Sequence, residues 1–195
     1  MSLRTHFHRE NQFQLFVRGS GHLGPHPIEA LTVHYAGAYT GYGPLVSGRE
    51  GLAYFTLRVV HETGSLTLAQ HGEQMRRGPK RSLYSQGVTV ADPERLQSLV
   101  EPATDDLIAL QPDRIGARLH SLPPRARAEG CLDPSGSAGQ FWVVLAGSAR
   151  FGARQLERWE SVFVHPSELL PQLLATEHGA QLVCLQVAAK APQYC

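Results

Sequence analysis

The sequence is poor in several features that would mark whole classes of protein. Its 195 residues hold only three cysteines, Cys131, Cys184 and Cys195. Three cysteines make no even disulfide framework, so we expect reduced thiols. A net charge of +1 gives no overall field that would attract nucleic acid or an anionic membrane. No apolar run approaches the roughly 18 residues that span a bilayer, and we predict neither nucleic acid nor a membrane as a partner.

Signature motifs of common enzyme classes are missing as well. The sequence has no Gly-x-Ser-x-Gly elbow, no phosphate-binding loop and no Cys-x-x-Cys pair. Its amino-terminal stretch is polar and lacks a secretory apolar core, so a cytoplasmic protein is expected. Hydrophobic residues make up 42% of the chain and charged residues 18%, a balance typical of a folded globular protein.

One segment of the chain occurs twice. Residues 11–24, NQFQLFVRGSGHLG, align without gaps on residues 139–152, GQFWVVLAGSARFG, at an offset of 128 residues. The same offset returns where GLAYFTLRV, from Gly51, matches GAQLVCLQV, from Gly179. One offset that holds over about fifty residues indicates a duplicated unit.

Both copies have the pattern of β-strands. Segments rich in branched and aromatic residues alternate with glycine-rich turns, as in an antiparallel barrel or sandwich. A helix start signal over 92–94 precedes an apolar stripe, which predicts one short helix over 93–100. The strands are predicted over 12–18, 28–35, 51–60, 107–110, 114–122, 125–129, 140–147, 161–166 and 180–187.

The basic run MRRGPKR, residues 75–81, lies between the two copies. It is either a solvated linker or a short nucleic-acid contact, and the near-neutral net charge favours the linker. We therefore divide the chain into a first unit over 1–70, a linker with a short helix over 71–104 and a second unit over 105–195.

The beginning of the first copy resembles the first motif of the cupins. That motif is His-x-His, then three or four residues, a glutamate, six residues and a glycine. His6, His8, Gln12 and Gly19 match its spacing, with Gln12 at the position of the family's glutamate. The resemblance implies an all-β fold of double-stranded β-helix (cupin) barrels, in two tandem copies.

The second copy is degenerate by the same comparison. Gln140 and Gly147 keep the spacing, but Pro134 and Gly136 stand opposite the two histidines, so this copy is expected to have lost its metal. The first copy has few residues before its motif and should lack one or two strands. Its unpaired edges would be covered by the second half of the chain or by another subunit, so a homodimer is expected.

The resemblance also implies a mononuclear site for a divalent transition metal (Fe, Zn, Mn or Ni) in the first copy. Alternation along a strand puts His6 and His8 on one face, and neutral imidazole binds these metals. The opposing interpretation is that the pair lies in a frayed terminus and binds nothing. The other candidate metal ligands are Gln12, Glu10, His34 and Tyr42.

Two functions fit these residues. The first is a metal-dependent enzyme acting on a small organic molecule, for which the resemblance implies oxygenase or isomerase chemistry. The alternative is a non-catalytic cupin that binds or senses a small-molecule ligand without metal. The retained histidines favour the enzyme and the missing glutamate favours binding, so the question stays open. In the second copy, Arg125, Arg127, Gln140 and Trp142 are either an organic-anion pocket or exposed arginines beside a core tryptophan.

Overall fold

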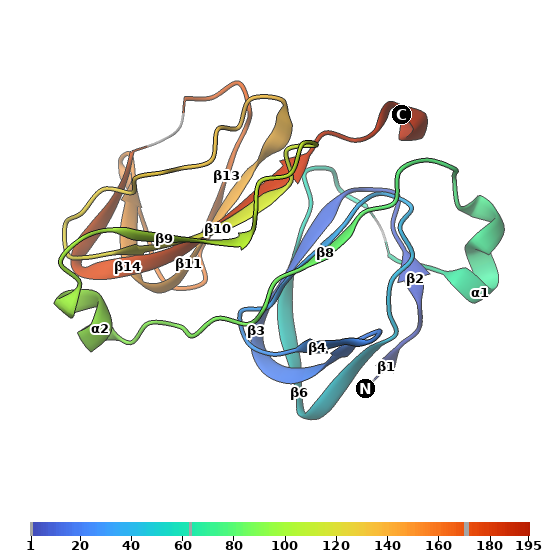
Figure 1. Cartoon of the computed structure of the whole chain (residues 1–195), viewed down its shortest axis with the longest axis horizontal. Coiled ribbons are helices and arrows are strands. Elements are labelled where there is room, and N and C mark those ends of the chain that lie inside the picture. Colours follow the sequence, from blue (N-terminus) through green and yellow to red (C-terminus); the bar gives the residue numbers. More distant parts are fainter. Residues whose placement is uncertain (1, 63, 170–171) are drawn as a thin grey trace. The chain divides into compact units, whose positions relative to one another are not determined.

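The structure, a computed structural model, describes residues 2–62, 64–169 and 172–195. Strands dominate it and its helices are short, so the prediction of an all-β fold with little helix is confirmed (Figure 1). The chain forms two compact units, one of Met1–Thr89 with Lys190–Cys195 and one of Val90–Ala189. No helix in the described part of the chain is long and apolar enough to cross a membrane.

The first unit is built mainly from strands, with short helices between β7 and β8 and near the carboxyl terminus. Its elements are β1 (Ser2–Leu3), β2 (His6–Phe7), β3 (Gln12–Leu23), β4 (His26–Ile28), β5 (Val33–Ala36), β6 (Leu45–Leu57), β7 (Leu66–Thr67), α1 (Leu68–His71), η1 (Gly72–Gln74), β8 (Ser82–Tyr84) and η2 (Pro192–Tyr194). The main sheet has the order β1-β6-β3-β5-β8, with β4 also paired to β3, and β2 pairs separately with β7. Strand β8 falls in the stretch expected to be a linker, and its pairing with β5 makes it part of the first sheet.

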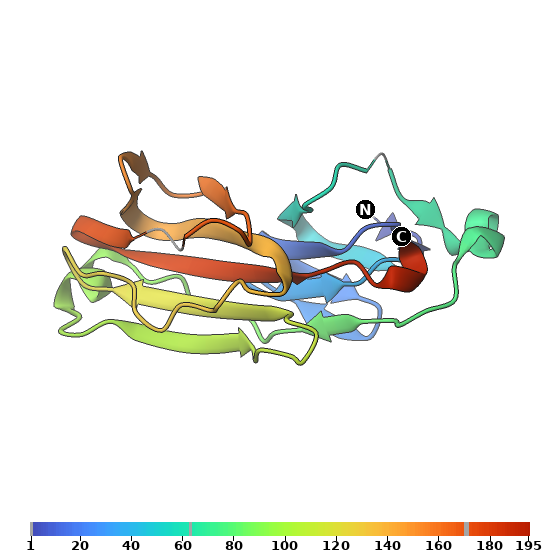
Figure 2. The same cartoon turned by 90° about the horizontal axis from the view of Figure 1, so that it is seen from above.

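The second unit repeats this plan. Its elements are α2 (Pro93–Ser98), β9 (Ala103–Ile108), β10 (Gly116–Leu122), β11 (Ser137–Phe151), β12 (Arg154–Leu156), β13 (Ser161–Val164) and β14 (Leu173–Ala188). The sheet order is β12-β11-β14-β10-β9, with β13 also paired to β11, and its long strands run side by side in Figure 2. Strands β11 to β14 pair among themselves as β3 to β6 do.

The correspondence extends to irregularities of the ladders. The β3–β6 register shifts between Phe16 and Arg18. The β11–β14 register shifts 128 positions later, between Val144 and Ala146. A β-bulge is a specific local geometry, and its recurrence at the offset read from the sequence means that the aligned segments have the same backbone course.

Matched glycines follow each bulge. Gly19 and Gly147 both have positive φ, +84° and +64°. A Cβ on Gly19 would overlap the carbonyl oxygen of Gly51, and a Cβ on Gly147 would overlap that of Gly179. The identity of these glycines in the two copies therefore reflects one close backbone crossing that occurs in both units.

Two of the predicted strands are wrong. The expected strand over 28–35 is split, because the chain turns after Ile28 with Leu31 at a φ of +61° and a Thr32 N–H bond to the carbonyl of Glu29. Arg125, in the expected strand over 125–129, also has positive φ, and that segment forms only an isolated bridge. Extended backbone cannot accommodate such residues.

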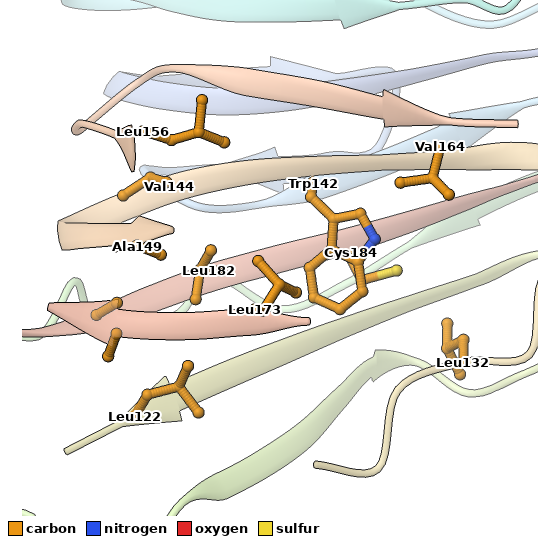
Figure 3. Close-up of a cluster of buried hydrophobic side chains, with 12 residues drawn as sticks. Leu122, Leu132, Trp142, Val144, Ala149, Leu156, Val164, Leu173, Leu182 and Cys184 are labelled. Carbon is orange, nitrogen blue, oxygen red and sulfur yellow. The ribbon is translucent and has the colours of Figure 1, made fainter. Parts of the chain in front are cut away.

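The core of the second unit surrounds Trp142, which is 1% exposed. Figure 3 shows its indole beside Cys184, with aliphatic side chains from β10, β11 and β14 around it. Alternate residues of these strands point to this side, because successive side chains of a strand alternate. The aliphatic residues labelled are Leu122, Leu132, Val144, Ala149, Leu156, Val164, Leu173 and Leu182.

His120 of β10 is a titratable residue in this interior. Its exposure is 0%, its ring lies 5.0 Å from that of Trp142, and neither ring nitrogen makes a regular hydrogen bond among the described residues. Burial lowers the pKa of His120 to about 4, and the Arg118 cation adds to this. The Glu129 backbone and the Asp106 carboxylate oppose the shift less strongly.

We predict that His120 makes the second unit sensitive to acid. In the unfolded chain the pKa of His120 is about 6.5. Between pH 6.5 and 4, His120 is therefore protonated in the unfolded state but neutral in the folded state. The stability is present above pH 6.5 and is lost as the pH falls, by about 3 kcal/mol for this pKa difference. His120→Leu should abolish that loss in urea denaturation followed by tryptophan fluorescence. His165→Leu, which removes an exposed histidine, is the control, and an unchanged pH slope in His120→Leu would contradict the prediction.

Candidate functional site

A pocket of about 210 Å³ lies in the first unit beside the predicted histidine pair. Four of the six predicted site residues line it, whereas Glu10 and His34 do not. Its polar lining consists of His6, His8, Gln12, Gln14, Tyr42, Tyr54, Thr56, Arg58 and Ser65.

The histidine pair is held firmly by the backbone around it. His6 exchanges two backbone hydrogen bonds with Tyr42, of 3.1 and 3.0 Å, and the carbonyl of His8 accepts one from Tyr39 at 2.6 Å. Both histidines are 6% exposed, and their ring centroids lie 5.4 Å apart. The interpretation as a frayed terminus is therefore wrong.

Arg58, one residue beyond the end of β6, was missed in the sequence and is central to the pocket. Its Nε donates to Oε1 of Gln12 at 2.8 Å. One of its terminal nitrogens lies 3.0 Å from Nδ1 of His8 and 3.2 Å from Nε2. The other donates to the carbonyl of Glu62 at 3.4 Å. A guanidinium is always charged and only donates hydrogen bonds, so a fixed cation lies at the histidine pair.

This arginine also sets the orientation of its neighbours. Because Arg58 can only donate, the side chain of Gln12 must present its oxygen there, and its Nε2 then donates to the Tyr42 hydroxyl at 2.5 Å. Burial raises the pKa of the Tyr42 hydroxyl well above its ordinary value, so the group stays protonated. Since its oxygen accepts from Gln12, the Tyr42 O–H is free to donate elsewhere.

His8 and His34 are neutral at physiological pH. Burial, followed by the charges of Arg58 and His6, lowers the pKa of His8 to about 3. Burial likewise lowers the pKa of His34 to about 3, with His26 and His6 adding to the shift. Nδ1 of His6 lies 2.7 Å from the carbonyl of Arg4 and donates to it, so Nε2 is the nitrogen of His6 that is not used in this bond.

The predicted ligands do not fit a divalent metal in this arrangement. The oxygen of Gln12 accepts from Arg58, and the carboxylate of Glu10 pairs with Lys190 at 2.5 Å. Both nitrogens of His34 are occupied, by Gln14 at 2.8 Å and by Ser82 at 3.1 Å. Among the residues that the structure describes, no three His, Cys, Asp or Glu side chains are grouped as metal ligands.

In the second unit, the positions that correspond to Gln12, Gln14 and Arg58 carry uncharged side chains that contact one another. At the offset of 128, Gln140 matches Gln12, Gln186 matches Arg58 and Trp142 stands where Gln14 would be. Nε2 of Gln140 donates to Oε1 of Gln186 at 2.8 Å, and Trp142 donates to Oε1 of Gln140 at 3.1 Å. The same cross-strand pair therefore exists in both units, with a cation only in the first.

The sequence held a signal for Arg58. The repeat aligns Arg58 with Gln186, which marks the position as one where the copies differ in charge. The alternative anion pocket of the second copy is not formed, because Arg125 and Arg127 are exposed and Trp142 belongs to the core.

A larger hollow of about 500 Å³ lies elsewhere on the first unit, between β4 and the segment that follows β8. Its charged and imidazole side chains, His22, His26 and Glu29, are all exposed. The smaller pocket has buried polar side chains held by hydrogen bonds to one another, so it is the candidate site.

Among known proteins, this chain is similar to solved structures, whereas its sequence matches no described family. No family model and no curated protein matches this sequence. Solved structures do match over almost the whole chain. A candidate dioxygenase from Nostoc punctiforme has a TM-score of 0.59 and 11% identity, covering 99% of this chain and 66% of its own. An oxalate decarboxylase has a TM-score of 0.56 and 12% identity, with 97% and 66% covered.

A third structure carries the family name directly. It is a cupin 2 conserved barrel domain protein from Leptotrichia buccalis, with a TM-score of 0.52 and 11% identity, covering 96% of this chain and 77% of its own. The chain thus spans about two thirds of the length of the first and second of these structures. At such low identity the likeness concerns the backbone alone. This chain has the fold of the cupin superfamily.

Proposed function

We propose that the first unit binds a small organic molecule in the Arg58 pocket without a resident metal, as a non-catalytic binding or sensing protein. The observation that carries the proposal is the guanidinium of Arg58, which hydrogen-bonds both Gln12 and His8. It places a permanent positive charge among the predicted metal ligands. The pocket beside it is lined by polar side chains and is concave, as small-molecule sites are.

Electrostatics supports a site without metal. Near a protein surface, two like unit charges about 4 Å apart repel by about 4 kcal/mol, and a divalent ion doubles that figure. A metal at His6 and His8 would have to overcome this repulsion or displace Arg58. Displacement would in turn leave the oxygen of Gln12 without its donor.

The metal-dependent enzyme is the second candidate, and one observation favours it. The bond to Arg4 uses Nδ1 of His6 and not Nε2, and the rings of His6 and His8 lie 5.4 Å apart. In that proposal Arg58 moves aside, and the pair binds Fe, Zn, Mn or Ni. The further ligands would come from Gln12, Glu10, His34 and Tyr42.

Elemental analysis of the purified protein tests the proposal. We expect far less than one metal ion per chain as purified, and only weak binding of added Zn²⁺. Arg58→Met, which removes the charge, should bind Zn²⁺ at least about tenfold more tightly than the original chain, given the repulsion just described. Stoichiometric metal in the original protein, lost in a His6→Ala, His8→Ala double variant, would favour the enzyme instead. The cytoplasmic location and the homodimer stay predictions from the sequence.

A further inference from the structure

The guanidinium of Arg58 has hydrogen-bonding capacity to spare. Arginine carries five N–H donors, and the contacts described above use three of them, with Gln12, His8 and the carbonyl of Glu62. All three of these acceptors are uncharged. Donors therefore remain for a ligand, on a cation whose described acceptors carry no negative charge.

A second donor lies across the same pocket. The oxygen of Tyr42 already accepts from Gln12 at 2.5 Å, so its own O–H has to donate to another group. Both Tyr42 and Arg58 line the pocket. Because Gln12 joins Arg58 to Tyr42 through its two amide atoms, one side chain fixes both donors in place.

The acidic group nearest the histidines does not take up these donors. The carboxylate of Glu62 lies 3.4 Å from Nδ1 of His8 and accepts from the backbone N–H of Arg9 at 2.8 Å. It does not line the pocket among the described residues. The polar atoms aimed at a ligand by Arg58 and Tyr42 are thus donors, with one positive charge.

The size of the pocket limits the ligand. A volume of 210 Å³ holds roughly seven water molecules at their share of the liquid volume. A drug-sized molecule needs more space than this. The part of a ligand that enters the pocket therefore has only a few carbon atoms.

We infer that the pocket binds a small monocarboxylate, with one or both oxygens on Arg58 and one on the Tyr42 hydroxyl. This inference rests on the proposed metal-free binding function. A planar carboxylate matches the fork of a guanidinium, and the charge-assisted bond is among the strongest that side chains form. Inorganic phosphate shares the oxyanion chemistry, but its tetrahedral dianion needs more donors and charge than one arginine and one hydroxyl provide.

Titration calorimetry of the full chain with propanoate, propanamide and phosphate tests the inference. Propanamide has the shape of propanoate without its charge. We expect propanoate to bind at least about tenfold more tightly than either of the others, as a lost charged hydrogen-bonding partner implies. Equal binding of propanoate and propanamide, tighter binding of phosphate, or no binding of propanoate would overturn the inference. None of these results would affect the metal content, on which the proposed function is tested.

Variants identify the residues involved. Arg58→Met should bind propanoate about tenfold or more weakly than the original chain, and Tyr42→Phe about three- to tenfold more weakly. Arg58→Lys keeps the charge but not the fork, and should lie between Arg58→Met and the original chain. Arg154→Met, which changes an exposed arginine of β12, is the control and should bind normally. If Arg58→Met fails to fold, Tyr42→Phe and the comparison of propanoate with propanamide still decide, and unchanged affinity in Tyr42→Phe would overturn the two-donor geometry.

Discussion

Replacing Gly147 with alanine should destabilise the second unit by at least about 4 kcal/mol, a loss at the extreme of single substitutions. The new Cβ would overlap the carbonyl oxygen of Gly179 and approach the Cα of Ala180. Both of these atoms belong to the backbone of β14, so no side chain can move aside. The long β11–β14 ladder must separate at its bulge to make room, and it is the central pairing of the unit.

Gly152, which directly follows β11, provides a matched control. It has nearly the same positive φ as Gly147, +57° against +64°, but nothing lies within 4 Å of a Cβ built on it. Gly152→Ala should therefore cost only the strain of a left-handed residue, about 1–2 kcal/mol. The difference between the two variants isolates the steric overlap from the backbone strain.

The chain carries convenient reporters for this comparison. Both tryptophans, Trp142 and Trp159, lie in the second unit, while all six tyrosines lie in the first. Urea denaturation followed by tryptophan fluorescence therefore reports the second unit alone. Equal midpoints for Gly147→Ala and Gly152→Ala would contradict the predicted overlap. In the first unit, Gly19→Ala and Gly51→Ala form the corresponding pair, since Gly51 also has open space around it.

The repeat is the part of the fold that the sequence predicts best. A Cβ at a close backbone crossing would overlap the opposite carbonyl, and so Gly19 and Gly147 are glycine in both copies although neighbouring side chains have changed. The strands β3, β6, β11 and β14 are also well signalled, because each is 12 to 16 residues long and includes a segment rich in branched and aromatic residues. Short strands carry less signal: β5 is four residues long and β8 three, and no periodicity can show in so few.

The candidate site could be predicted only in part. The His-x-His spacing located the pocket, since His6, in β2, and His8, just after it, both line the pocket. Arg58 was missed because motif spacing describes one strand at a time, and this residue comes from the neighbouring one. Glu10 shares the parity of the histidines, yet its carboxylate pairs with Lys190, which is 180 residues away in the chain. Such long-range partners leave no mark in local sequence.

The carboxyl-terminal segment is a second feature that the sequence did not reveal. Residues 190–195 belong to the first unit, although they follow the last strand of the second. Tyr194 is 4% exposed and packs in a cluster with Phe7, Ala38 and Tyr39. The basic run predicted to be a solvated linker surrounds it, because the Nζ of Lys80 lies 5.0 Å from the centre of the Tyr194 ring.

The hydroxyl of Tyr194 adds polar contacts to this packing. It accepts from Lys80 at 2.9 Å and donates to the carbonyl of Pro79 at 2.9 Å. Gly78 lies under the ring, where a Cβ would come within 2.6 Å of two ring carbons. Residues of the run MRRGPKR therefore pack against one aromatic side chain. Gly78, Pro79 and Lys80 each contact Tyr194.

Tyr194→Ala should destabilise the first unit by about 3–5 kcal/mol, the usual cost of deleting a buried aromatic ring. Tyr194→Phe keeps the ring and removes only the hydroxyl, so it should cost about 0.5–1.5 kcal/mol. The remaining five tyrosines report the first unit in near-ultraviolet circular dichroism during urea denaturation, while tryptophan fluorescence follows the second. The result expected is a lower midpoint in the tyrosine signal for Tyr194→Ala. If Tyr194→Phe lowered the midpoint as much as Tyr194→Ala, the hydrogen bonds of the hydroxyl with Lys80 and Pro79 would be the main stabilising contacts. If neither variant changed the midpoint of the tyrosine signal, residues 190–195 would not be part of the folded first unit.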